Sequence, residues 1–386
     1  MGYSNQTPPE KTTLVVDGNW LLMGRQFMLR EKFSLSNAES IRLSATNELA
    51  DLMAQSISVC LRGFGSVITN IVFVADGGSW RKSVDKPGVI DGEVYKGTRS
   101  LESNTDWTAV WSAMGLIEKR LRALGVTVCV GDGVEGDDWC WWWSRTLNAR
   151  GENVILWTVD EDIKQLVQAD RRTGCWTGWY ERKRGLVLHE KLAPQLPCTD
   201  EDDITWLMMD VFKESNPTVE ILEGMTKVSY INPTEIINKK IFVGDNGDNI
   251  LPAFTYTKNG RTFKATLKDL EKVMDMKDRG FEYDNDWEGT LKGMYKDIME
   301  NKKNSVRGTD VTTEEDFIDH VKYNRRVVWL DESQYPDEIL RTMQSVEYHQ
   351  LSENVIHDLR FNWKTISDAS ATEEISALFD DEDLPL

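Results

Sequence analysis

Carboxylate residues recur along the first two thirds of the chain in short motifs that could bind metal ions. The densest motif is GVEGDDWCWWW, residues 133–143, and others are VVDGN, FVADGG, TVDED and GDNGD. Converging like charges raise one another's pKa, so such a set requires a cation. Carboxylate oxygens suit Mg²⁺ or Mn²⁺ rather than Zn²⁺. The candidate ligands are Asp17, Asp76, Glu135, Asp137, Asp138, Asp160, Asp162, Asp245 and Asp248.

Two such ions about 4 Å apart could stabilise the attacking and leaving oxygens of a phosphodiester during in-line displacement. Each motif alone is weak, because DGN and DGG are common turn sequences. An acidic triplet before a helix is usually explained by the positive end of the helix dipole. The complete set, with every acid expected at the end of a strand, favours a metal-dependent phosphotransfer site.

The elements that must position these acids alternate between strands and helices. Helices are expected at about 38–62, 108–124 and 138–149, with a hairpin at 171–190 and a partly helical, acidic stretch at 199–223. This alternation predicts an α/β fold with a mostly parallel central sheet flanked by helices. Open sheets of this class bind ligands at the carboxyl ends of the strands. Buried strands that end in acids are expected within 12–17, 70–76, 126–132, 153–162 and 239–248.

Composition limits the class of protein. The chain has 386 residues and a formal charge of −19, which argues against long-range attraction of the whole molecule to nucleic acid but leaves room for a local basic path. Five cysteines without CxxC pairing indicate reduced thiols, and the four scattered histidines give little support to histidine chemistry. Neither a signal peptide nor a membrane-spanning run is evident, so a cytoplasmic monomer without membrane contact is expected.

Domain organisation is predicted from shifts in composition. Residues 1–11 form a flexible lead-in, 12–255 an α/β catalytic domain and 256–365 a smaller helical domain, followed by the acidic tail 366–386. In the tail, Ile375, Leu378 and Phe379 could anchor a partner, although a solubilising tail is an equal alternative.

A basic stretch follows Asp76, where a negatively charged phosphate would need a partner. Residues 80–99 read WRKSVDKPGVIDGEVYKGTR. The spacing of Tyr95, Lys96 and Arg99 would allow base stacking and phosphate contacts from one helix turn; the alternative is a solvated loop. The remaining candidates for nucleic-acid contact are Arg25, Arg81, Lys82, Lys258, Arg261 and Lys264. For the last three, a solvated helix face is an equal alternative.

Tryptophans are concentrated directly after the acidic triplet. Trp139, Trp141, Trp142 and Trp143 point around the expected helix, so they cannot all face one ligand, and most should pack in the core. Trp20 lies close to Asp17 and could meet substrate beside Arg25, or pack in the core.

Taken in order, VVDGN, FVADGGSWR, YKGTR, GVEGDD, TVDEDIKQL and FVGDNGDNI resemble the flap endonuclease / 5′-nuclease family. The likeness is strongest to its 5′-to-3′ exonucleases (ribonucleases H) from T-even-type bacteriophages. The motifs cover residues 13–255, and a weaker similarity continues to about Met343. The resemblance implies a PIN-like 5′-nuclease fold with a helical arch at about 80–110 and a duplex-binding C-terminal domain.

The same resemblance implies a cofactor and residue roles. Two Mg²⁺ ions, which Mn²⁺ could replace, would be bound, with Asp17, Asp76, Glu135 and Asp137 serving the first. Asp138, Asp160, Asp162, Asp245 and Asp248 would serve the second. Lys96 and Arg99 would act near the scissile phosphate, beneath the arch.

The implied activity is removal of RNA primers and flaps during DNA replication. The substrates would be forked, flapped or nicked DNA and RNA–DNA duplex, and the tail could bind a single-stranded-DNA-binding protein or a sliding clamp. One departure concerns potassium: GDNGDNILPAF lacks the family's IPGVxGIG pattern, so a potassium site is not expected.

Two other functions are compatible with parts of the sequence. A haloacid-dehalogenase-like phosphatase would explain the D-x-D of TVDED, but it would leave the other acids without a role. A catalytically silent protein that binds forked DNA would explain the fold, but it would have no need of the complete acid set.

Overall fold

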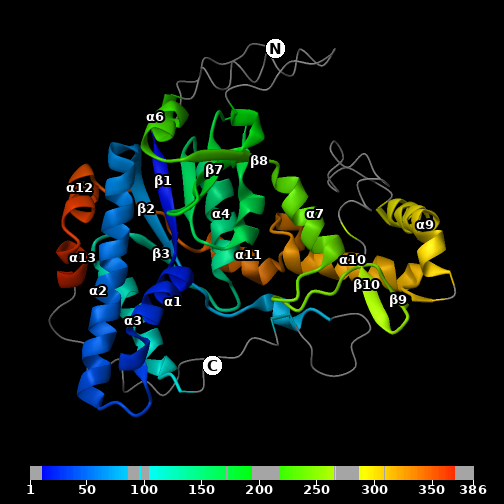
Figure 1. Ribbon diagram of the computed structural model, residues 1–386. Coiled ribbons are helices and arrows are strands. Elements are labelled where there is room, and N and C mark those ends of the chain that lie inside the picture. The colour runs from blue at the N-terminus through cyan, green and yellow to red at the C-terminus, as the bar shows by residue number, and fades with distance from the viewer. Residues whose placement is uncertain are drawn as a thin grey trace. The chain divides into compact units, whose positions relative to one another are not determined.

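The computed structural model describes residues 11–85, 95–96, 104–170, 173–193, 217–264, 266, 287–307 and 309–369 (Figure 1). The chain divides into two compact units. The α/β unit comprises described residues of 1–78, 101–231 and 338–386, and the smaller unit those of 79–100 and 232–337. Residues 1–10 of the predicted lead-in, Arg99 and nearly all of the acidic tail lie outside the described residues.

An eight-stranded sheet forms the centre of the α/β unit. Its order is β3-β2-β1-β4-β6-β7-β8, and β5 pairs with β6. The pairs β3/β2, β2/β1, β1/β4, β4/β6 and β7/β8 are parallel, whereas β6 is antiparallel to β5 and β7. The predicted mostly parallel sheet and the hairpin within 171–190 are therefore confirmed. The strands are β1 (Thr12–Asp17), β2 (Ile68–Val74), β3 (Thr127–Cys129), β4 (Asn153–Trp157), β5 (Gln168–Ala169), β6 (Trp176–Glu181), β7 (Gly185–His189) and β8 (Val228–Ile231).

Burial on both faces explains why β1 is a run of apolar residues without alternation. Leu14 and Val16 pack into a core shared with α1 (Gly18–Leu29), α2 (Glu39–Phe64) and α3 (Trp107–Ala123). Val15 points to the opposite face because side chains alternate along a strand. Helix α4 (Gly136–Ala149) packs against β1, β2, β4 and β6. Central parallel strands covered by helices on both faces are expected to be apolar throughout.

The C-terminal helices return to the α/β unit, which differs from the predicted helical domain at 256–365. α12 (Glu353–Phe361) and α13 (Lys364–Asp368) pack against α2 (Figure 1). Leu359 and Ile366 belong to the same core as β1 and β2. Arg360 Nη2 also donates to Ile68 O at 3.1 Å. Burial of these apolar side chains holds the segment on the sheet unit.

The smaller unit combines helices with a three-stranded sheet of order β10-β9-β11. Ile241, Phe242, Phe254, Leu291 and Phe317 contribute to its core. Its elements are η3 (Trp80–Ser83), α7 (Pro233–Val243), β9 (Thr255–Lys258), β10 (Arg261–Lys264), α9 (Trp287–Val306), β11 (Asp310–Val311) and α10 (Glu314–Val328); α11 (Asp337–Gln344) begins at its end.

Two predictions for this unit are wrong. The strand predicted within 239–248 is the end of helix α7, because Asn232 caps the helix and Pro233 occupies its first turn. Lys258, Arg261 and Lys264 lie on the exposed hairpin β9–β10, so the alternative of a solvated helix face is wrong, and their contact with nucleic acid stays a prediction. Among the described helices, none has the length and apolar character needed to cross a membrane.

Candidate metal centre

Four neighbouring parallel strands bring their carboxyl ends to one edge of the α/β unit. Asp17 is the last residue of β1, and Asp76 and Asp160 follow the ends of β2 and β4. Glu135 follows β3 and is the N-cap residue of α4. The strand order 3-2-1-4 places β1 between connections that run in opposite directions, and such a switch point is where open sheets bind ligands.

The acids converge on the first turn of α4. A Cβ atom added to Gly136 would lie 3.1 Å from Asp76 Oδ1 and 3.9 Å from Asp17 Oδ1. Gly136 N itself donates to Asp76 Oδ1 at 2.6 Å. Burial raises the pKa of the Cys140 thiol well above its usual value, and the charges of Asp17, Asp137, Asp160 and Asp76 add to this shift. Acids from all four strand ends therefore lie close enough to the Cys140 thiol to interact with it electrostatically.

Asp17 is a buried carboxylate with ordered partners. Its Oδ1 accepts from Trp20 N at 3.0 Å, and its Oδ2 accepts from Thr158 Oγ1 at 2.7 Å. Burial is the main cause that raises the pKa of Asp17, with a contribution from Asp160, although both hydrogen bonds oppose the rise. A nearby cation would favour the ionised form that a metal ligand requires.

Close backbone packing fixes the loop that carries Asp76. Asp76 N donates to Asn19 Oδ1 at 2.8 Å. Gly77 N donates to Val134 O at 2.9 Å, which joins the loop after β2 to the loop after β3. A Cβ atom at Gly77 would lie 2.1 Å from Gly131 O, so only glycine permits this approach. The two loops therefore present their acids as one rigid edge.

The acidic triplet serves both as helix start and as part of the cluster. Asp138 is completely buried, and its Oδ2 accepts from Glu135 N at 3.0 Å. This bond is the capping interaction that the simple helix-start interpretation expects. Glu135 is buried, and Asp137 is partly exposed and acts electrostatically on Cys140. The ligand role of Asp138 stays a prediction.

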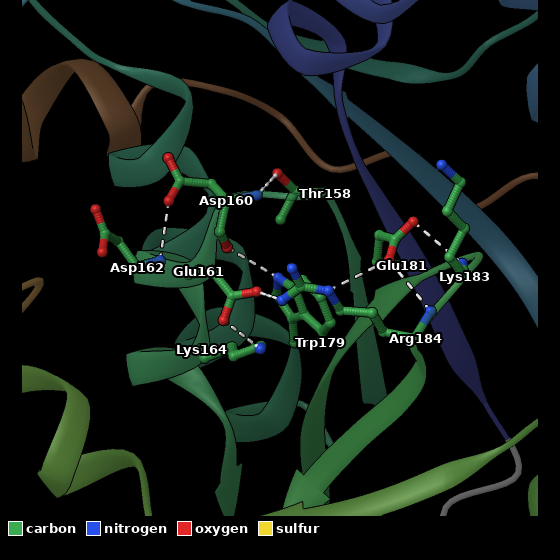
Figure 2. A network of polar contacts seen from close by, with 9 residues as sticks. All are labelled: Thr158, Asp160, Glu161, Asp162, Lys164, Trp179, Glu181, Lys183 and Arg184. Atoms are coloured by element: carbon green, nitrogen blue, oxygen red, sulfur yellow. Dashed lines mark hydrogen bonds and ion pairs between the residues drawn. The ribbon is translucent and has the colours of Figure 1, made fainter. Parts of the chain in front are cut away.

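A hydrogen-bonded network holds the acids after β4 (Figure 2). Asp160 N donates to Thr158 Oγ1 at 3.1 Å, and Asp160 Oδ1 accepts from Asp162 N at 2.9 Å. Trp179 Nε1 donates to Asp160 O at 2.9 Å. Figure 2 shows Glu161 turned toward Lys164 and Arg184, with which it forms ion pairs, and away from Asp160 and Asp162.

Thr158 was not among the predicted site residues, although it stands directly at the end of β4. Its hydroxyl donates to Asp17 and accepts from Asp160 N, so it joins the loops after β1 and β4. Asn19 plays a comparable part for Asp76. The signal in the sequence was weak, because a threonine or an asparagine beside an acid is common in turns.

The donor chemistry of the cluster fits a hard divalent cation. The converging groups of the α/β unit are carboxylates, and within the described residues no histidine joins them. The buried Cys140 thiol has a raised pKa and is therefore protonated, which makes it a poor metal ligand. Oxygen-only sets of this kind suit Mg²⁺.

The smaller unit contains the last two predicted ligands. Lys240 Nζ lies 2.9 Å from Asp245 Oδ2 and 3.2 Å from Asp248 Oδ2. Burial alone would raise the pKa of Asp245, but its hydrogen bond and ion pair with Lys240 lower it below the usual value. Sequence reasoning missed Lys240. A lysine one turn before two acids at a helix end is the signal that could have identified it.

Lys96 and Tyr95 also belong to the smaller unit. Lys96 N donates to Asp248 O at 3.1 Å, and the φ of Lys96 is +56°, a left-handed conformation that is rare for residues other than glycine. Lys96 Nζ lies 5.0 Å from the centroid of the Tyr95 ring. Tyr95 is only 5% exposed and packs in a cluster with Ile250 and Tyr323. Because its ring is buried, Tyr95 is better suited to hold Lys96 in place than to stack on a base of nucleic acid, as was predicted.

The other predicted basic residues differ in accessibility. Arg81 is 2% exposed and stacks between Trp80 and Tyr335, so it cannot meet nucleic acid as the structure stands. Arg25 Nε donates to Ser56 Oγ at 2.7 Å. The side chains exposed to solvent are Lys82, Lys258, Arg261 and Lys264. Most of the predicted arch, including Arg99, lies outside the described residues.

The tryptophans after the triplet are mainly core residues, as expected. Trp139, Trp141 and Trp143 are buried, and Trp142 is partly buried. Trp143 Nε1 donates to Cys129 Sγ at 3.0 Å, which fastens α4 to β3. Trp20 packs edge-on against Trp157, with ring centroids 5.4 Å apart, and therefore fits the core interpretation.

Thr158→Val is expected to weaken the binding of a divalent ion at this cluster by about 10–100-fold. Valine keeps the shape of threonine but removes the hydroxyl that orients Asp17 and Asp160. A titration of the full chain with Mn²⁺, with the free ion measured by electron paramagnetic resonance, measures the effect. Thr69→Val is the matched control, because Thr69 Oγ1 bonds to Thr12 at the other end of the strands. An unchanged Mn²⁺ affinity in Thr158→Val would remove Thr158 from the site.

Comparisons with known proteins identify similar structures but no family match. No protein-family model and no curated protein matches the sequence. The structure is similar to that of the T5 D15 protein co-crystallised with metal ions, with 14% identity, a TM-score of 0.47 and coverage of 93% of this chain and 100% of that one. It is also similar to T5 5′-exonuclease with bound zinc ions, with 14% identity, a TM-score of 0.43 and coverage of 92% and 100%.

A third similar structure is the bacteriophage T5 D15 flap endonuclease in a pseudo-enzyme–product complex with DNA and metal ions. The identity is 14%, the TM-score is 0.43, and the alignment covers 93% of this chain and 100% of that one. At such low identity, the function of this chain has to be argued from its own residues.

Proposed function

We propose that this chain is a Mg²⁺-dependent 5′-nuclease of the flap endonuclease / 5′-nuclease family. It would act as a 5′-to-3′ exonuclease and flap endonuclease on RNA primers and on DNA near 5′ ends and junctions during replication. The observation that carries the proposal is the convergence of acids from four adjacent parallel strands on the start of α4. Gathering several carboxylates at one edge of a sheet is unfavourable unless a cation binds them.

Asp17, Asp76, Glu135 and Asp137 would hold the first ion, and Asp160, Asp162 and Asp138 would contribute to the second, together with Asp245 and Asp248. Two divalent ions bound there would activate water and offset the charge of the leaving oxygen. Thr158 and Asn19 orient the acids through the hydrogen bonds described above. Lys96 and Arg99 would bind the scissile phosphate. Both roles are taken from the resemblance of the YKGTR motif to the flap endonuclease / 5′-nuclease family.

Two competing functions can be distinguished by the same assay. A haloacid-dehalogenase-like phosphatase would use Asp160 as its nucleophile, but it would leave Asp17, Asp76 and Asp137, which converge near Cys140, without a role. A silent binding protein would gain nothing from acids that converge at four strand ends. Contacts of the tail with a single-stranded-DNA-binding protein or a sliding clamp remain predictions about residues that the structure does not describe.

The test is incubation of a labelled 5′-flap substrate, and of an RNA-primed duplex, with the protein and Mg²⁺. We expect release of short 5′-phosphorylated products with Mg²⁺ or Mn²⁺ and none with EDTA. Binding without cleavage in Mg²⁺ would contradict the proposal and favour the silent binding protein. Phosphate release from small esters, with flaps left intact, would favour the phosphatase.

A further inference from the structure

Asp245 and Asp248 lie where the dipole of helix α7 disfavours negative charge. Both follow the C-terminus of α7, the negative end of the helix dipole. Acids in this position are destabilised unless a cation offsets them. Lys240, in the last turn of the same helix, supplies that cation.

The loop that carries the two acids is closed by backbone hydrogen bonds. Asp245 and Ile250 exchange both backbone hydrogen bonds, at 2.9 and 2.8 Å. Gly244 adopts a φ of +75°, and a Cβ atom there would lie 2.6 Å from Ile250 O. Gly247 N donates to Asp245 Oδ1 at 2.8 Å, so the Oδ2 atom is the one turned to Lys240. Both carboxylates therefore present Oδ2 to the same ammonium group.

The ammonium group of Lys240 lies within ion-pair distance of both Oδ2 atoms. The Lys240 side chain is 12% exposed and that of Asp248 is 7% exposed, so solvent screens this pair far less than a surface ion pair. A metal–oxygen bond to Mg²⁺ is about 2.1 Å long, so an ion bound to both Oδ2 atoms would displace Lys240 Nζ. Lysine has a flexible four-carbon stem, which makes such a displacement feasible.

We propose that the ammonium group of Lys240 neutralises the Asp245–Asp248 pair and that a divalent ion must displace it to bind there. This competition lowers the affinity of the pair for the metal ion. The inference rests on the proposed function in one respect, because it takes the two acids to be metal ligands. It goes further by assigning Lys240 a positioning role. Lys240 keeps the loop ordered, and with it the backbone of Lys96 that donates to Asp248 O, before any metal arrives.

The test is Mn²⁺ binding to the full chain without nucleic acid, with the free ion measured by electron paramagnetic resonance. Lys240→Met keeps the length of the side chain and removes its charge. We expect the weaker class of Mn²⁺ sites to bind about tenfold more tightly in Lys240→Met than in the wild type, which corresponds to about 1.4 kcal/mol. Lys240→Arg retains the charge and should bind Mn²⁺ as the wild type does.

A second variant assigns the effect to this pair. Adding Asp245→Asn and Asp248→Asn to Lys240→Met should abolish the tighter binding. Mn²⁺ affinity that does not change in Lys240→Met, or tighter binding that survives the loss of both acids, would overturn the inference. Thermal melts of each variant identify any that fail to fold, in which case Lys240→Gln replaces Lys240→Met.

The outcome is independent of the cleavage assay. A protein that fails to cut flaps but binds Mn²⁺ more tightly as Lys240→Met would disprove the proposed nuclease and leave the role of Lys240 standing. A protein that cuts flaps but shows no change in Mn²⁺ affinity would retain the nuclease proposal and lose the role of Lys240.

Discussion

Asp160→Asn is expected to lower the single-turnover rate of flap cleavage by about a thousandfold, or roughly 4 kcal/mol, while binding of duplex DNA changes by less than about threefold. Asparagine has the size of aspartate, and its Oδ1 can still accept from Asp162 N. The backbone bonds of Asp160 to Thr158 and Trp179 do not involve its side chain. The substitution therefore removes one negative charge and little else.

Glu161→Gln is the matched control for this variant. Glu161 is the next residue, carries the same charge and forms ion pairs with Lys164 and Arg184 away from the acid cluster (Figure 2). Its loss should leave the cleavage rate within about twofold, because exposed ion pairs contribute little. Full activity in Asp160→Asn would remove Asp160 from the metal centre, and equal losses in both variants would point to a general charge effect.

The acids of the α/β unit could be predicted from the sequence because two strong rules apply to them. Apolar runs such as LVV before Asp17 and VILW before Thr158 have the length of buried strands and are separated by amphipathic helices. Helical crossovers make such strands parallel, so their carboxyl ends must share one edge. The position of Asp17, Asp76, Glu135 and Asp160 follows from these rules without any knowledge of side-chain contacts.

The environment of Asp245 and Asp248 could not be predicted in this way. The residues IFV within the run KKIFV have high strand propensity. However, Ile241 and Phe242 are buried in the core of the smaller unit, and this tertiary packing stabilises the helix. The asparagine cap and the proline at the helix start were available as local signals and were overlooked.

Interactions between distant residues were equally inaccessible to sequence reasoning. The hydroxyl of Thr158 meets Asp17 across 141 positions, and Ser58 donates to Leu359 across 301 positions. Nothing in the residue types of 353–369 indicates that α12 and α13 pack on α2. Such contacts depend on the assembled fold, which is why the predicted domain border at 255 and 256 differs from that of the compact units.

Lys96→Ala is expected to lower the single-turnover cleavage rate by about 10–100-fold, with a change of less than about threefold in the dissociation constant of the flap substrate. A charge-assisted hydrogen bond contributes about 1.5–3 kcal/mol, and in this proposal it forms with the phosphate as charge develops there. Alanine is as unfavourable as lysine at a φ of +56°, so the variant keeps the local strain and isolates the side chain.

The control for Lys96→Ala must remove an equal charge from the same unit without touching substrate. Lys303→Ala meets this requirement, because Lys303 is 62% exposed and pairs with Glu300 in the neighbouring turn of α9. We expect its rate and affinity to equal those of the wild type. Lys96→Gly adds a second comparison: glycine relieves the left-handed backbone but also lacks the ammonium group, so it should be as slow as Lys96→Ala. A cleavage rate that Lys96→Gly restores would show that the backbone conformation, and not the ammonium group, is what the reaction requires of this residue.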